Sequence, residues 1–140
     1  MAEPISNLLA SLCGAGKPLQ QEPFDANEFA GLLRSGIARL KDAGNTTLAL
    51  ESRFDLAHNA AHSLSLAAPR QMGYRSGNRH IVLQVLPHTL GLGAEVWPVL
   101  DKCLNTRNLG KYEGMLDIDE RLVTDLITAT QAVADSMSKL

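Results

Sequence analysis

This 140-residue chain has few of the features that mark specialised protein classes. Its two cysteines, Cys13 and Cys103, are too few for a disulfide scaffold and are typical of a reduced intracellular protein. No apolar run is long enough to cross a bilayer, and the N-terminus lacks the basic and apolar regions of a signal peptide. We therefore expect a soluble, cytoplasmic protein with no membrane contact.

Strand-like alternation of apolar and polar residues is also missing. Apolar residues recur instead at helical spacing, in stretches separated by glycine and proline. The pattern predicts an all-α fold, an up-and-down bundle of four to five main helices over residues 25–140. An N-terminal arm with a short helix is expected over residues 1–24.

Capping residues and prolines predict where several helices begin and end. Asp25 with Glu28, and Asp117 with Glu120, have the spacing of capping boxes, in which the two side chains bond to each other's backbone. Pro87 is expected to kink or end a helix over residues 78–90. The next helix is expected to begin near a proline at position 98.

The central helix, predicted over residues 48–68 with residues 45–47 as its cap, combines a broad apolar face with a narrow polar stripe. Glu51, Asp55, His58 and His62 recur at i, i+4, i+7 and i+11 and therefore lie along one side. The two histidines have the spacing of a helical metal clamp, which indicates a metal-dependent hydrolase as one alternative. The other reading is a hydrogen-bonded histidine pair beside the core.

Charge is segregated along the sequence. No Asp or Glu occurs between residues 56 and 94, whereas Arg70, Arg75, Arg79 and all four histidines lie there. This distribution predicts an electropositive surface, on the same side of the bundle as Arg107, that suits a phosphate-bearing ligand. Alternatively, Arg70 complements a helix C-terminus and the other two arginines are solvated.

A second group of basic residues lies at one helix end within residues 101–114. Lys102, Arg107 and Lys111 fall there, beside Asn108 and Tyr112. The planar guanidinium of arginine suits a phosphate, and tyrosine can stack on a base. The same spacing also describes an ordinary amphipathic helix end, whose basic side chains complement the helix dipole.

The helix order, the Ala-rich central helix, the Gly-Tyr-Arg turn at residues 73–75 and the Arg107-Asn108 pair followed by Tyr112 resemble the HEPN domains (higher eukaryotes and prokaryotes nucleotide-binding). The resemblance covers residues 25–140. HEPN proteins are helical bundles that commonly form homodimers. Many are metal-independent ribonucleases or toxins, and others are non-catalytic binding modules.

The family signature is an Arg followed after four to six residues by a His, and Tyr112 occupies the His position here. The resemblance implies that Arg107, Asn108 and Tyr112 line a dimer cleft for RNA or a nucleotide, without a cofactor. His58 and His62 are the candidates to replace the motif histidine. An antitoxin or nucleotidyltransferase partner, and a pure protein-interaction role, are the further implications.

Overall fold

The computed structural model describes residues 13–14, 16–17, 19–76, 78–92, 95–113 and 118–139, except for the side chains of residues 79, 88 and 109–113. The elements follow one another as β1 (Gln20–Gln21), α2 (Ala26–Ala43), α3 (Leu50–Gln71), β2 (Tyr74–Arg75), α4 (Arg79–Gln84), α5 (Leu86–Thr89), α6 (Trp97–Glu113) and α7 (Glu120–Met137). The all-α prediction is confirmed. No helix in the described ranges is both long and apolar enough to cross a membrane.

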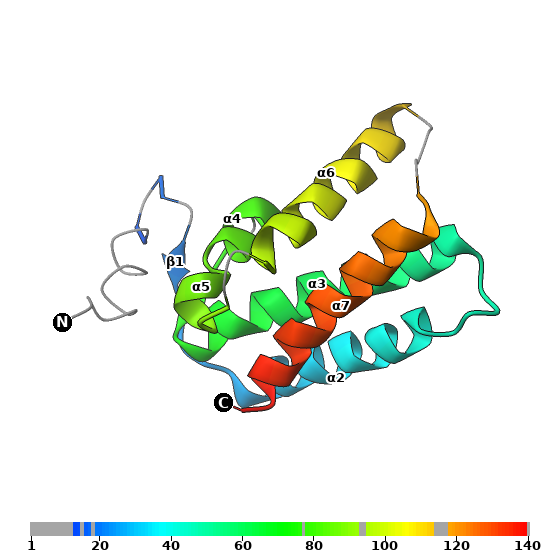
Figure 1. Ribbon diagram of the computed structural model, residues 1–140. Coiled ribbons are helices and arrows are strands. Elements are labelled where there is room, and N and C mark those ends of the chain that lie inside the picture. Colours follow the sequence, from blue (N-terminus) through cyan, green and yellow to red (C-terminus); the bar gives the residue numbers. More distant parts are fainter. Residues whose placement is uncertain are drawn as a thin grey trace.

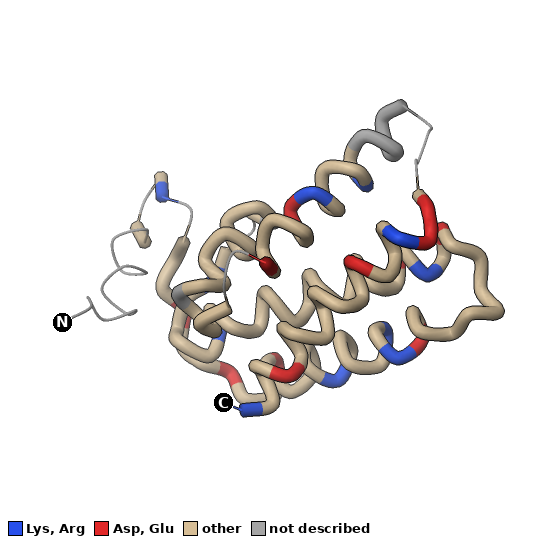
Figure 2. Tube along the Cα trace, in the orientation of Figure 1, with Lys and Arg blue, Asp and Glu red and all other residues tan. Residues whose placement is uncertain are grey.

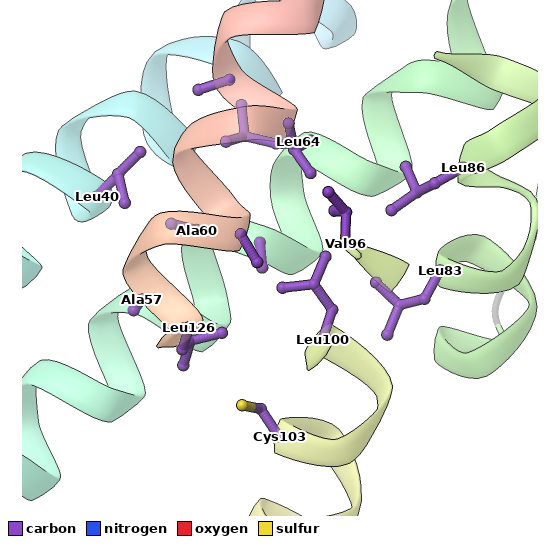
Figure 3. Packing of buried hydrophobic residues seen from close by; sticks show 14 of the residues in the cluster. Leu40, Ala57, Ala60, Leu64, Leu83, Leu86, Val96, Leu100, Cys103 and Leu126 are labelled. Atoms are coloured by element: carbon purple, nitrogen blue, oxygen red, sulfur yellow. The ribbon is translucent and has the colours of Figure 1, made fainter. Parts of the chain in front are cut away.

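Helix α3 lies at the centre, with α2 on one side and α4, α5 and α6 on the other (Figure 1). Helix α7 crosses in front of α3 and packs against α2, α3 and α6. Side chains from all these helices meet around it, as Figure 3 shows for Leu40, Leu64, Leu100 and Leu126. Its buried alanines are short enough to let neighbouring helices approach closely. The predicted role of this helix as the axis of the bundle is confirmed.

The caps agree with the sequence at one helix and differ at the next. Asp25 caps α2, where its Oδ1 accepts hydrogen bonds from the backbone N–H groups of Asn27 and Glu28 at 2.9 and 3.1 Å. Helix α3, however, begins at Leu50 and has no side-chain cap at Ala49. The expected cap at 45–47 is wrong because Asn45 closes a separate turn there, accepting from the Thr47 N–H at 3.0 Å.

Helix α7 is capped by a different aspartate from the predicted one. Asp119 has extended backbone, and its Oδ1 accepts a hydrogen bond from the Leu122 N–H at 2.8 Å. The predicted box of Asp117 and Glu120 is wrong because the N-cap is the extended residue directly before the first helical one, which is Glu120. Asp117 itself lies outside the described residues.

Both proline predictions are confirmed. The helix expected over residues 78–90 is divided at Val85 into α4 and α5, and Pro87 lies in the first turn of α5. Pro98 lies in the first turn of α6, which begins at Trp97. In both places the missing N–H of proline removes no intrahelical hydrogen bond.

The N-terminal arm packs against the bundle by a short antiparallel pairing of β1 with β2. Leu19 is fully buried in a small second cluster with Tyr74 and Val85. Two-residue strands are too short to produce an alternating pattern, so the sequence did not indicate them. The short helix predicted before Cys13 lies outside the described residues.

Candidate functional site

The inward face of α6 changes from apolar to polar along its length. Leu100, Cys103 and Leu104 are buried, and one turn later Arg107 and Asn108 continue the same side of the helix and are half-buried. The two residues of the predicted motif whose side chains the structure describes therefore border the core. They are not part of a fully solvated helix end.

A small cavity connects α3 with this face of α6. Its volume is about 10 Å³, at the lower limit for one water molecule. The lining residues are His58, Ala61, His62, Leu83, Leu100, Leu104 and Leu126. Leu104, the residue of α6 furthest along the helix in this lining, lies one turn before Arg107.

The polar stripe of α3 is exposed at its start and covered further along. Glu51 and Asp55 are exposed, whereas His58 is only 4 % exposed. The His58 ring also stacks on Phe54, with 6.2 Å between ring centroids. The exposure of the stripe follows the course of α6. The first turns of α6 lie beside α3, and the later turns diverge from α3 toward Glu113 (Figure 1).

The stripe does not form a metal centre. Within the described ranges, no three His, Cys, Asp or Glu side chains come together as a metal ion would require. Asp55 points to solvent while His58 is buried, so the carboxylate and the imidazole do not converge. The metal-dependent hydrolase therefore has no supporting geometry in this part of the chain.

Arg70 is a structural residue at the last turn of α3. Its side chain is 2 % exposed, and its Nε donates to Glu28 Oε1 at 2.6 Å. Its two Nη groups donate to the backbone carbonyls of Glu22 at 3.0 Å and Pro23 at 2.7 Å. The prediction that Arg70 contributes to an electropositive surface is wrong, because its guanidinium is buried and its charge is balanced by the carboxylate of Glu28.

Arg75 belongs to the same cluster, forming ion pairs with Glu22 and Glu28. Hydrogen bonds first from Arg70 and then from Arg75 lower the pKa of Glu28. Hydrogen bonds to Glu22 and Glu28 raise the pKa of Arg75 in turn. We call these four residues the arm cluster, because they join the N-terminal arm to the ends of α2 and α3.

The carboxylates of the arm cluster lie 42 to 53 residues from their arginine partners, so no local sequence pattern indicated these ion pairs. Of the capping box predicted for Asp25 and Glu28, only the Asp25 half is found, because the Glu28 carboxylate pairs with Arg70 and Arg75. Around the bundle, acidic and basic residues are interspersed along α2 and α7 (Figure 2). The sequence segregation of charge therefore does not produce one basic face in the described residues.

The remaining predicted residues lie on or near α6. Lys102 is exposed. The backbone of Lys111 and Tyr112 continues α6 and that of Arg79 begins α4, but these three side chains lie outside the described residues. The structure places His58 and His62 at the cavity beside Leu104, and Arg107 and Asn108 one turn further along α6. Arg75 lies in the arm cluster, beyond the C-terminal end of α3.

One polar pair was not indicated by the sequence. His80 of α4 and Asp101 of α6 are joined by a hydrogen bond of 2.6 Å between Nδ1 and Oδ1. Their side chains are 41 % and 23 % exposed. The two residues are 21 positions apart on different helices, so only the packing of α4 against α6 could reveal them.

Cys103 is excluded as a nucleophile. Its side chain is fully buried among apolar residues, and burial raises the pKa of its thiol to about 11, while Lys102 nearby opposes this effect and Asp125 adds to it. The thiol is therefore protonated at neutral pH and contributes to packing.

Comparison with protein-family models, with curated proteins and with solved structures gives no match.

Proposed function

We propose that this chain is a HEPN-like helical bundle that binds RNA or a nucleotide, as a homodimer, through the part of α6 around Arg107. The observation that carries the proposal is the position of Arg107 at the point where the inward face of α6 turns polar. This position lies one turn beyond the cavity that His58 and His62 line.

Arg107 has the chemistry of a phosphate contact. In the described part of the chain no carboxylate forms an ion pair with Arg107, whereas Arg70 and Arg75 are both engaged by Glu22 and Glu28. A guanidinium that is not engaged by a carboxylate can donate two parallel hydrogen bonds to a phosphate group.

Neighbouring residues would extend the contact beyond one phosphate. Asn108 is half-buried beside Arg107 and carries both a donor and an acceptor for a base edge. Lys102 is exposed on another side of the same helix, so it adds to the positive potential around α6 and not to the contact with the same phosphate. Stacking on Tyr112, which the motif resemblance implies, would supply the apolar part of nucleotide recognition.

The test is a binding titration in excess EDTA with a fluorescently labelled, mixed-sequence RNA oligonucleotide, and with mononucleotides as competitors. Arg107→Ala should weaken RNA binding about tenfold and reduce the salt dependence by about one phosphate contact. Arg34→Ala is the matched control, because Arg34 is exposed on α2, on the far side of α3 and α7 from α6.

Two results would contradict the proposal. Absence of RNA and nucleotide binding by the unmodified protein would remove it, and equal affinities of the Arg107→Ala and Arg34→Ala proteins would move the site away from α6. Competition by mononucleotides distinguishes a nucleotide site from an RNA site. Sedimentation of the protein as a monomer at micromolar concentration would remove the homodimer.

A further inference from the structure

One side of the central helix α3 is left open by the described helices around it. Helix α2 lies on one side of α3, helices α4 to α6 lie on the other, and α7 lies in front (Figure 1). Exposed and half-buried side chains recur on the remaining side at i, i+4, i+7, i+11 and i+14, so they form one row. The row, which we call the open row, consists of Ser52, Leu56, Asn59, Ser63 and Leu66.

The contacts of α3 fix the direction in which the open row points. A Cβ atom at Gly36 of α2 would touch Leu64, and the cavity toward α6 and α7 is lined by His58 and Ala61. At about 100° per residue, the open row lies about 120° from both Leu64 and His58, and directly opposite Ala61. The open row therefore faces away from α2, α6 and α7.

The open row has the composition of an interface and not of a solvated helix face. None of its five side chains is charged, over 14 residues or about 21 Å of helix. The exposed positions of α2 and α7, by contrast, include Arg34, Lys41, Asp125 and Asp135. Depletion of charged residues is the compositional mark of an interface core.

The open row is complementary to itself. If two copies of α3 pack antiparallel about Asn59, Leu56 of each copy lies opposite Ser63 of the other. Leu66 lies opposite Ser52 in the same way, so each large side chain meets a small one. Asn59 meets its own copy, and each amide can both donate and accept a hydrogen bond. A two-fold interface requires such self-complementarity, because the same patch is used on both subunits.

The border of the open row adds a match of charge. Asp55 is exposed and His62 is half-buried on the flank of α3 that lies toward α6. In the antiparallel pairing, Asp55 of one copy lies at the level of His62 of the other, because the two positions are spaced almost evenly about Asn59. A carboxylate can accept a hydrogen bond from an imidazole there, and the two-fold axis repeats the contact.

We propose that the open row is the interface at which two copies of this chain pack α3 against α3, antiparallel, about a two-fold axis through Asn59. This inference names the interface of the homodimer in the proposed function and rests on that homodimer, but it does not depend on RNA binding. A stable interface buries about 800 Å² on each partner. Helices at their usual spacing make this side of the bundle about 30 Å wide and about 21 Å long, which supplies an area of that order.

The experiment is sedimentation equilibrium of the full chain carrying Asn59→Asp or Asn59→Lys. Each variant alone should raise the dimer Kd at least about tenfold, because like charges meet at the two-fold axis. An equimolar mixture of the two should dimerise within about tenfold of the unmodified affinity, because opposite charges then meet. Misfolded variants could not show this rescue. Thr128→Asp is the matched control, because Thr128 is exposed on α7, which covers the opposite side of α3.

Disulfide formation tests the direction of the pairing. Asn59→Cys should cross-link two copies under mild oxidation, because position 59 lies at the axis. Ser63→Cys should not, because the two copies of position 63 would be about 11 Å apart along the helix, whereas a disulfide spans Cα atoms at most about 7 Å apart. Cross-linking of both variants at one rate would overturn the antiparallel pairing. The unmodified chain, with Cys13 and Cys103, gives the background.

The failure of this inference is distinguishable from that of the proposed function. A dimer that both Asn59 variants leave intact, or a loss that mixing does not restore, would overturn the open row and leave RNA binding at Arg107 untouched. A monomeric unmodified protein would overturn the open row and the homodimer together, and the RNA titration with Arg107→Ala would still decide the binding site.

Discussion

At the scale of single residues, Gly36 is where α2 comes closest to α3. A Cβ atom at this position would lie 2.6 Å from Cγ and 2.8 Å from Cδ2 of Leu64, whose side chain is fully buried and cannot move aside freely. At Gly31, five residues earlier in α2, the nearest atom would be the end of the Arg34 side chain at 4.0 Å. The two glycines therefore differ in the space available, although both are in the same helix.

We expect Gly36→Ala to lower the free energy of unfolding by about 1–3 kcal/mol, because the added methyl group overpacks the contact with Leu64. Gly31→Ala should raise it by about 0.5–1 kcal/mol, because alanine loses less backbone entropy in a helix. Urea unfolding measures both. A stabilising effect of both substitutions would mean that α2 and α3 are further apart than described.

At the scale of elements, Arg70 connects the N-terminal arm, α2 and the end of α3. Replacing it with alanine leaves the backbone carbonyl groups of Glu22 and Pro23 and the carboxylate of Glu28 without this donor. We expect Arg70→Ala to lower the free energy of unfolding by about 2–4 kcal/mol, because a buried side chain and several of its charge-assisted hydrogen bonds are lost. Arg75→Ala, which removes a half-exposed arginine of the same arm cluster, should lower it by less than about 1 kcal/mol.

Chemical denaturation of the two variants distinguishes a buried connection from a surface ion pair. Similar losses in both would mean that Arg70 is not the residue that holds the arm.

The start of α7 depends on one side chain. Asp119 accepts the hydrogen bond from the Leu122 N–H, so Asp119→Ala should lower the free energy of unfolding by about 1 kcal/mol. Asp125→Ala, at an exposed position inside the same helix, should change it by less than about 0.5 kcal/mol. Thermal unfolding followed by circular dichroism compares the stabilities of the two variants. Equal losses would mean that Asp119 is not the residue that caps α7.

At the scale of the whole molecule, the arm cluster makes the free energy of unfolding depend on pH. The pKa of Glu28 in the folded protein lies below its ordinary value of 4.5, so the folded protein holds the charged form more strongly than the unfolded chain does. Its contribution to stability is therefore fully present above about pH 4.5 and is lost as the pH falls through the lowered pKa.

We expect Glu28→Gln to be less stable than the unmodified protein at neutral pH, and the difference between the two to shrink as the pH falls below about 4.5. Urea midpoints measured from pH 7 to pH 3 provide the comparison. A difference that stays constant over this range would show that Glu28 acts through packing and not through its charge.

Much of the fold could be predicted because helical periodicity, caps and prolines are local properties of the chain. The apolar spacing of residues 48–68, the cap at Asp25, and the prolines at 87 and 98 each act within one or two turns, so the sequence by itself determined an all-α bundle and most helix limits. The cap of α7 differed because Asp117 and Asp119 are both suitable, and the backbone conformation before Glu120 selected Asp119.

Only the tertiary structure decided which charges meet. The sequence grouped Arg70 and Arg75 with Arg107 as one basic surface, but helix docking placed two of them beside Glu22 and Glu28. The same docking buried His58, left Asp55 exposed and joined His80 to Asp101. These partners lie tens of residues apart, and a Coulomb interaction depends on the distance between side chains in space, which the packing of helices sets and the order of residues does not.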